Sequence, residues 1–247
     1  YDPRFVYMLT RQGRMHSQIA AFPSLAFYAD KLQPVPLSHQ TAALQLTHSS
    51  NGIARMLTSY RMAFVCSERP RLSVSTKTNE LEAQMIAAIV HQIYLLHKEQ
   101  FDVNQTIGII VPYRNQISAI RNAISQYSIP ILRQISIDTV ERFQGSQRDY
   151  IIYGFTIQQP WQLNFLCGNT FLEDGALIDR KLNVAMTRAR LQLTLVGNPQ
   201  LLSHNITFRR LIDYVKAQGA FLETDVEHFC KGDFTLPSSD ADAIDLS

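Results

Sequence analysis

Residues 179–198 read DRKLNVAMTRARLQLTLVGN, a run that predicts a helix leading directly into a strand. Apolar residues recur on one helical face at positions i, i+3, i+4 and i+7, namely Leu182, Ala185, Met186 and Ala189. Asp179 is suited to the N-cap, since its carboxylate can accept from free backbone amides of the first turn. Residues 191–196 then alternate between apolar and polar, and Gly197-Asn198 form a turn signal. We therefore expect a helix over 179–190 and a strand over 191–196.

Basic side chains flank the apolar face of this predicted helix. Lys181 and Arg188 lie to one side, and Arg180 and Arg190 lie to the other. Planar guanidinium groups on a rigid element are suited to binding an anion. An ordinary basic surface would show the same pattern, and this stretch alone leaves both interpretations open.

Outward from this stretch, apolar runs alternate with helical patterns. The predicted strands are 63–66, 106–112, 135–140 and 150–155, and the predicted helices are 79–97, 113–127 and 201–216. Strands that are apolar on both faces are typical of a central parallel sheet. The alternation predicts an α/β sandwich with a mostly parallel sheet. In such folds ligands bind beyond the carboxyl ends of the strands, which here carry 112–114, 139–145 and 197–198.

Other segments are less regular. Residues 11–32 have a roughly helical pattern, which Pro23 is expected to break into two helices or to restart. Residues 33–60 are expected to be irregular, with a β-excursion as an alternative, and residues 158–175 to form a loop. The Ser- and Asp-rich end, 238–247, is typical of disorder.

Composition limits the class of protein. The 247 residues are 46% hydrophobic and 18% charged, which fits a globular chain with a sizeable core. No apolar run is long enough to span a membrane, and the three cysteines have no metal-binding spacing. We expect free thiols and a cytoplasmic protein. Residues 223–247 hold seven acidic residues and one basic residue, so residues 1–222 carry 22 bases against 14 acids. That surplus is compatible with nucleic acid or nucleotide phosphates.

Four blocks, taken together, resemble the second RecA-like domain of a superfamily 1B helicase, of the nonsense-mediated-decay and DNA-replication helicase-nuclease kind. In family order they are QGRMHS at 12–17, GIIVPYRNQ at 108–116, TVERFQGSQRD at 139–149 and the helical stretch 179–190. The resemblance implies a RecA-like three-layer sandwich over residues 1–222, followed by an acidic and partly disordered tail over 223–247.

The resemblance also implies roles for individual residues. Arg188 would be the arginine finger, with Arg14 as its partner and Gln144 as a third catalytic residue. Five positions would contact ATP: Arg14, Gly145, Gln147, Arg188 and Arg190. Four positions would contact nucleic acid or brace that face: Tyr113, Arg114, Gln116 and Thr139. No residue is expected to bind a metal ion.

The sequence lacks the phosphate-binding loop G-x-x-x-x-G-K-[ST], and no acidic pair follows an apolar strand as a Mg²⁺ site would need. ATP with Mg²⁺ would therefore be bound mainly by a first RecA-like domain elsewhere in a longer protein, which is an expected partner. This chain alone is expected to be inactive. The other expected partner is single-stranded nucleic acid, DNA in preference to RNA, with movement from 5′ to 3′, and no membrane.

Two residues depart from the family pattern. Gly13 replaces the tyrosine that stacks on adenine, and Gln147 replaces a glutamate that accepts from ribose. We expect weaker or less selective nucleotide binding as a result. One alternative function is a degenerate RecA-like module that binds nucleic acid or protein without ATP hydrolysis. Another, an unrelated α/β nucleotide enzyme, is disfavoured because the phosphate loop is missing.

Overall fold

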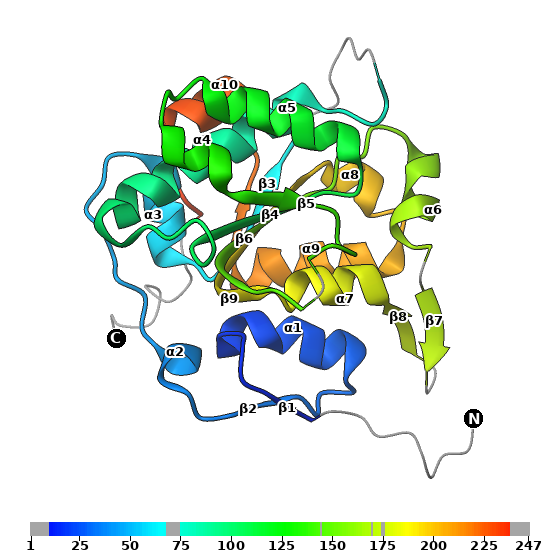
Figure 1. Cartoon of the computed structure of the whole chain (residues 1–247). Helices are drawn as coiled ribbons and strands as arrows, with labels where there is room; N and C mark the ends of the chain where they lie inside the picture. Colours follow the sequence, from blue (N-terminus) through cyan, green and yellow to red (C-terminus); the bar gives the residue numbers. More distant parts are fainter. Residues whose placement is uncertain (1–9, 68–74, 144, 169, 174–175, 238–247) are drawn as a thin grey trace, which may run out of the picture.

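The computed structural model describes residues 10–67, 75–143, 145–168, 170–173 and 176–237. A six-stranded sheet lies at its centre in the order β10-β3-β9-β6-β4-β5, and every neighbouring pair is parallel (Figure 1). The strands are β3 (Met62–Cys66), β4 (Ile107–Ile110), β5 (Ser136–Asp138), β6 (Arg148–Gly154), β9 (Ala189–Gly197) and β10 (Ala220–Leu222). The predicted α/β class is confirmed, and the central sheet is wholly parallel.

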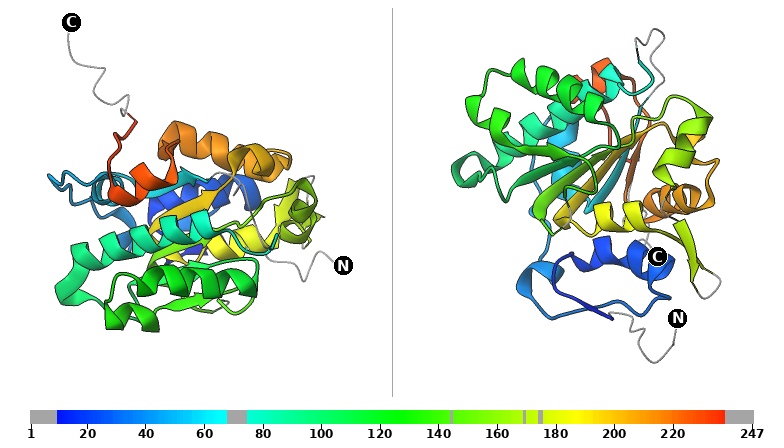
Figure 2. Two further views of the ribbon diagram at one scale, coloured as in Figure 1. Left: turned by 90° about the horizontal axis from the view of Figure 1, so that it is seen from above. Right: turned by 45° about the vertical axis from the view of Figure 1, so that its right-hand side comes forward.

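Helices cover both faces of this sheet, which gives the three layers of a RecA-like fold (Figures 1 and 2). One face carries α3 (Gly52–Ser59), α4 (Glu80–His97), α5 (Arg114–Ser125) and α10 (Val226–Lys231). The other face carries α1 (Ser17–Phe27), α7 (Arg180–Met186), α8 (Pro199–Leu202) and α9 (Ile206–Gln218). Each layer has its own apolar core. Phe155 and Phe208 pack edge-to-face in one, and Ile89 and Ile152 are fully buried in the other.

Smaller elements lie at the margins. The remaining α-helices and strands are β1 (Arg11–Gln12), β2 (Gln33–Pro34), α2 (Ser38–Thr41), α6 (Leu163–Leu166), β7 (Thr170–Glu173) and β8 (Ala176–Asp179). Short 3-10 turns are η2 (Lys98–Gln100), η3 (Pro130–Gln134) and η4 (Pro160–Gln162). The paired strands β1 and β2 lie beyond α1, away from the central sheet (Figure 2). Among the described residues, no helix is long and apolar enough to cross a membrane.

The helix α7 begins where the sequence predicts, because the Asp179 carboxylate accepts from the Leu182 amide at 3.0 Å. Its end differs from the prediction. The helix stops at Met186 and β9 begins at Ala189, so Arg188 lies in the junction and Arg190 lies on the strand. The Arg188 Nε donates to the Val184 carbonyl at 3.0 Å, which satisfies a free acceptor of the last helical turn. The predicted helix over 179–190 is therefore too long by four residues.

Three other expectations need correction. Helix α1 continues through Pro23 instead of breaking there, and buried Phe22 and Phe27 hold it against the core. The irregular stretch 33–60 contains α3, which the Asn51 side chain caps by accepting from the Ile53 and Ala54 amides. The expected loop 158–175 contains η4, α6 and β7.

Part of the stretch expected as an acidic tail is ordered against the domain. Helix α10 packs on α4, and its Phe229 is fully buried and stacks on Phe234. The disorder predicted for 238–247 falls outside the described residues. The division of the chain at residue 222 stays a prediction.

Candidate functional site

Three segments that are distant in the sequence meet at the amino ends of β6 and β9. The Arg148 amide donates to the Arg188 carbonyl at 3.0 Å, and the His16 amide donates to the Arg190 carbonyl at 2.8 Å. Backbone hydrogen bonds thus fix the segments around Arg14, Gln147 and Arg188 beside one another. We call Arg14, Gln147 and Arg188 the arginine cluster.

Arg188 is held tightly at the junction of α7 and β9, with 9% of its surface exposed. Besides the bond to Val184, its Nη1 donates to the Ser146 carbonyl at 3.3 Å and its Nη2 to the Thr187 hydroxyl at 3.2 Å. A guanidinium carries five N–H groups, so these three bonds orient it while two N–H groups remain for a ligand.

Arg14 approaches the same point from the loop between β1 and α1. Its Nη1 donates to the Thr187 carbonyl at 2.9 Å, and its Nε donates to Gln147 Oε1 at 3.0 Å. Thr187 therefore touches both arginines, one through its carbonyl and one through its hydroxyl. The amide of Gln147 is bonded to Arg14 in this arrangement.

The two guanidinium groups affect each other electrostatically. Burial, and next the positive charge of Arg14, lower the pKa of Arg188 below its ordinary value. Both effects mean that the protein destabilises the charged form, although a guanidinium stays protonated at neutral pH. An anion placed between the two groups would relieve this repulsion. The arginine cluster is therefore suited to phosphate oxygens.

The turn before Gln147 depends on Gly145. Its φ of +87° lies in the left-handed region that favours glycine, and its surface is open. Ser146 follows and closes the turn through bonds from its amide and hydroxyl to the Phe143 carbonyl. This turn places Ser146 and Gln147 against the arginines. Gln144, expected to be catalytic, falls outside the described residues.

Arg190 was expected to contact ATP, but the structure ties it elsewhere. Its Nη1 forms an ion pair with the Asp149 carboxylate at 2.7 Å, between the starts of β9 and β6. Burial is the largest influence on Asp149 and raises its pKa, while Arg190 opposes that shift. The contacts of Arg190 are those of a residue that joins two strands.

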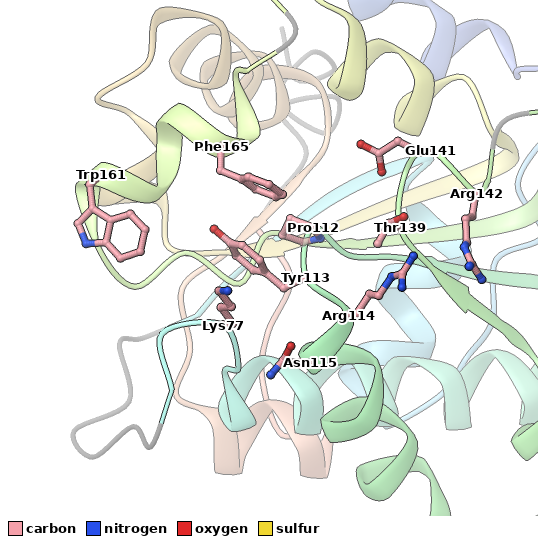
Figure 3. Close-up of a pocket in the computed structure, with 10 residues that line it drawn as sticks. All are labelled: Lys77, Pro112, Tyr113, Arg114, Asn115, Thr139, Glu141, Arg142, Trp161 and Phe165. Carbon is pink, nitrogen blue, oxygen red and sulfur yellow. The ribbon is translucent and has the colours of Figure 1, made fainter.

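A separate cavity of about 560 Å³ lies at the carboxyl ends of β4 and β5 (Figure 3). We call it the carboxyl-edge pocket; it is lined by Lys77, Pro112, Tyr113, Arg114, Asn115, Thr139, Glu141, Arg142, Trp161 and Phe165. It contains three of the four residues expected to contact nucleic acid, because Tyr113 and Arg114 follow β4 and Thr139 follows β5. This pocket therefore lies where the sequence predicts ligands to bind, at the carboxyl ends of the strands. The arginine cluster lies at the other edge of the sheet, at the amino ends of the strands.

Gln116, the fourth of those residues, does not reach the pocket. It is fully buried, its Oε1 accepts from the Asn79 amide at 2.7 Å, and its Nε2 donates to the Asn79 carbonyl at 2.9 Å. Its expected contact with nucleic acid stays a prediction, and in this structure the side chain is bonded to Asn79. These bonds join the start of α5 to the start of α4, which fits the bracing role.

We expect Gln116→Ala to lower the free energy of unfolding by about 1–3 kcal/mol, because it leaves the buried Asn79 amide without a partner, while the Asn79 carbonyl keeps its bond from the Ala83 amide. Urea denaturation measures this change. Asn115→Ala, at the exposed neighbouring position, is the control and should stay within about 0.5 kcal/mol of the unaltered chain. Equal stabilities for both variants would refute the bracing role.

Sequence reasoning missed the aromatic side of the pocket. Trp161 on η4 and Phe165 on α6 are 59% and 47% exposed, and Phe165 stacks on Tyr113 with ring centroids 5.0 Å apart. Both lie in the segment predicted as a loop. The only signal in the sequence was two large aromatic residues in a stretch bounded by Pro160 and Gly168. Lys77 was also missed, and it reaches the pocket from the segment before α4.

A metal site is not evident in the described part of the chain, where no group of three or more His, Cys, Asp or Glu side chains is placed to hold an ion. The donors at the arginine cluster are cationic N–H groups and an amide, which suit phosphate oxygens and not a metal. The residues present therefore fit the phosphate end of a nucleotide.

Comparison with known proteins gives consistent matches. The family described as an AAA domain matches residues 2–200. A probable helicase of Dictyostelium discoideum is 36% identical over 85% of this chain and 20% of its own length, and helicase sen1 of Schizosaccharomyces pombe is 33% identical over 83% of this chain and 11% of its own. Regulator of nonsense transcripts 1 of Dictyostelium discoideum is 30% identical over 87% of this chain and 15% of its own length.

This chain thus spans only between about a tenth and a fifth of the length of these relatives. Among solved structures, the C-terminal domain of a possible DNA helicase from Lactobacillus aligns with a TM-score of 0.37 and 16% identity, over 80% of this chain and 96% of that one.

Proposed function

Because this chain belongs to the AAA-domain family that includes the superfamily 1 helicases, we propose that it is the C-terminal motor domain of an ATP-dependent nucleic-acid helicase. Arg14 and Arg188 would act on ATP and Mg²⁺ bound mainly by a first RecA-like domain. The carboxyl-edge pocket would form part of the track for a single strand. By itself this chain would not hydrolyse ATP.

The observation that carries the proposal is the meeting of Arg14 and Arg188 around Thr187. Two guanidinium groups brought together at bonding distance from one residue are electrostatically unfavourable unless an anion compensates them. In phosphoryl transfer, negative charge on the terminal phosphate is the quantity that such groups stabilise. Arg188, the more constrained of the two, would supply the finger, and Arg14 would support it through Gln147.

The proposed ATP contacts differ in how strongly the geometry supports them. Gly145 and Gln147 belong to the turn beside the arginines and are exposed, so a nucleotide could reach both. Arg190 is committed to Asp149 and would act by holding the amino ends of β6 and β9 together. Gln147 would have to exchange its bond with Arg14 for one with a ribose hydroxyl, which is consistent with modest nucleotide affinity.

The proposed track uses the pocket at the opposite edge. Arg114 and Lys77 make no ion pair within the described residues, so their charges are available to phosphates of a strand. Thr139 lies between them and Arg142 and would offer its hydroxyl to the same backbone (Figure 3). Contacts to phosphate carry little sequence preference.

Duplex unwinding by the full-length protein tests the proposal. We expect ATP-dependent displacement of a duplex that carries a 5′ single-stranded tail, and at most about a tenth of that rate with a 3′ tail, since the proposed movement is from 5′ to 3′. Labelled strand release in a gel measures both rates. The chain of 247 residues alone is the control and should release no strand. Unwinding that prefers the 3′ tail would contradict the proposed direction.

A further inference from the structure

We propose that Trp161 is a stacking platform for a nucleobase, next to a phosphate-binding position formed by Lys77 and Arg114. The inference rests on the proposed single-strand track and adds a base-binding position to it. Within one cavity, Figure 3 shows Trp161, Phe165 and Tyr113 toward one side, Lys77 beside Tyr113, and Arg114 and Arg142 toward the other side. That pairing of chemistries matches a single strand, whose bases have flat apolar faces and whose backbone is anionic.

Trp161 is the ring available for stacking. It is 59% exposed and lies on the 3-10 turn η4, at one side of the pocket (Figure 3). Phe165, by contrast, is 47% exposed and already has two partners for its ring: Tyr113 stacks on it at 5.0 Å with an interplanar angle of 17°, and the Lys181 ammonium lies 4.5 Å from its ring centroid. The Phe165–Tyr113 pair therefore forms a wall, and the indole is the open surface beside it.

The turn that carries Trp161 is fixed in place by the next residue. Gln162 is fully buried, and its Oε1 accepts from the amides of Gln158 and Gln159, both at 2.9 Å. Its Nε2 donates to the Thr76 carbonyl at 2.8 Å and to the Tyr113 hydroxyl at 3.3 Å. This anchoring holds an apolar ring in water at a defined place, and a preorganised ring loses little freedom when a base stacks on it.

A single exposed tryptophan is common on protein surfaces and would not suggest a ligand by itself. The charged side chains around Trp161 do suggest a ligand. Lys77, Arg114 and Arg142 line the pocket, while its one acidic residue, Glu141, is paired with Lys181 at 3.2 Å. Arg142 lies 3.7 Å from Asp138 and forms an ion pair with it. Lys77 and Arg114 are the pocket cations for which the described residues offer no ion pair. An anionic strand complements this surface better than an apolar peptide does.

Trp161 also provides the measurement, since it is the only tryptophan in the chain. We expect its fluorescence to be quenched when a single strand of about 10 nucleotides binds at low salt, because a stacked base contacts the indole directly. A strand of equal length that lacks bases should bind more weakly and should leave the fluorescence unchanged. Its phosphates would still reach Lys77 and Arg114.

Anisotropy of a labelled strand measures the contribution to affinity. We expect Trp161→Ala to weaken binding between about 5-fold and about 150-fold, and Trp161→Phe to keep most of the affinity, since it retains an aromatic face. Leu46→Ala, which removes another exposed apolar side chain away from the pocket, is the matched control and should bind like the unaltered chain. Neither variant of Trp161 changes a buried residue.

The outcomes separate this inference from the proposed function. Unchanged fluorescence together with equal affinity of Trp161→Ala would overturn the stacking platform. If Arg114→Ala still weakened binding and reduced the slope of affinity against salt, the track itself would stand. A chain that bound no single strand even at low salt would overturn both. Binding of a strand without bases as tightly as the intact strand would also refute the base-binding position.

Discussion

Arg188→Ala in the full-length protein is expected to lower the rate of ATP hydrolysis about 1000-fold. The guanidinium would stabilise negative charge that develops on the transferred phosphate, and alanine offers no substitute. Arg188 is suited to this because three hydrogen bonds orient it and burial keeps water from screening its charge. Steady-state turnover at saturating ATP and nucleic acid measures the loss.

Three comparisons make this result interpretable. Arg188→Lys should recover little activity, because an ammonium cannot reproduce the planar fork. Arg210→Ala, at an exposed position on α9, is the control and should leave turnover unchanged. The melting temperature of Arg188→Ala shows whether the lost bonds to Val184 and Ser146 have damaged the fold. Turnover unchanged in a folded Arg188→Ala protein would favour the degenerate module that binds without hydrolysis.

Glu82→Gln is expected to remove a large pH dependence of stability. Glu82 lies on α4 with no exposed surface, and burial raises its pKa from 4.5 to about 8. Three donors limit that rise: the Thr156 amide at 2.8 Å, the Ser67 hydroxyl at 3.0 Å and the Asn79 side chain at 3.3 Å. Between pH 4.5 and about pH 8, Glu82 keeps its proton in the folded chain but has released it in the unfolded chain.

The sign follows from that difference in bound protons. The free energy of unfolding should fall as pH rises from about 4.5 to about 8, by up to about 1.4 kcal/mol per pH unit from this group. A glutamine resembles the protonated acid and does not titrate, so Glu82→Gln should be more stable than the unaltered chain near pH 8. Urea denaturation across the pH range measures the difference. Glu80→Gln, exposed in the same first turn, is the control and should reproduce the unaltered profile.

The sequence predicted the parallel layers well, because long apolar runs and helical stripes depend mainly on local residues. The strand over 106–112 and the helix over 79–97 are such cases. The end of α7 and the start of β9, on either side of Arg188, were less predictable. Ala189 fits the apolar face of a longer α7, yet it is the first residue of β9, where it pairs with Arg148. That choice depends on pairing with Arg148, which is 41 residues away in the sequence (189 − 148), and not on the local pattern.

The arginine cluster shows a second limit. Motif resemblance identified Arg14 and Arg188, but nothing local to either residue indicates that both donate to Thr187. Arg190 and Gln116 resemble ligand contacts in sequence, whereas tertiary structure gives them Asp149 and Asn79 as partners. A polar residue in a motif can serve the ligand or the scaffold, and only its neighbours in space distinguish the two.

Two features had almost no signal in the sequence. Trp161 lies in a segment without periodicity, and its exposure depends on how Gln162 anchors the turn. Glu82 resembles an ordinary acid in the first turn of a helix, where it would favour the helix dipole. Its burial comes from Gly154 and Thr156 at the end of β6, which the local sequence does not reveal.

We propose that Arg188 acts on the phosphate during its transfer. The most direct test compares binding of ATP and of ADP with aluminium fluoride, which mimics the transferred phosphoryl group, to the full-length protein and to Arg188→Ala. We predict that Arg188→Ala binds ATP nearly as well as the unaltered protein but loses about 1000-fold in affinity for the mimic, since the finger favours the transition state over the ground state. Equal losses for both ligands, or no loss for the mimic, would contradict the claim.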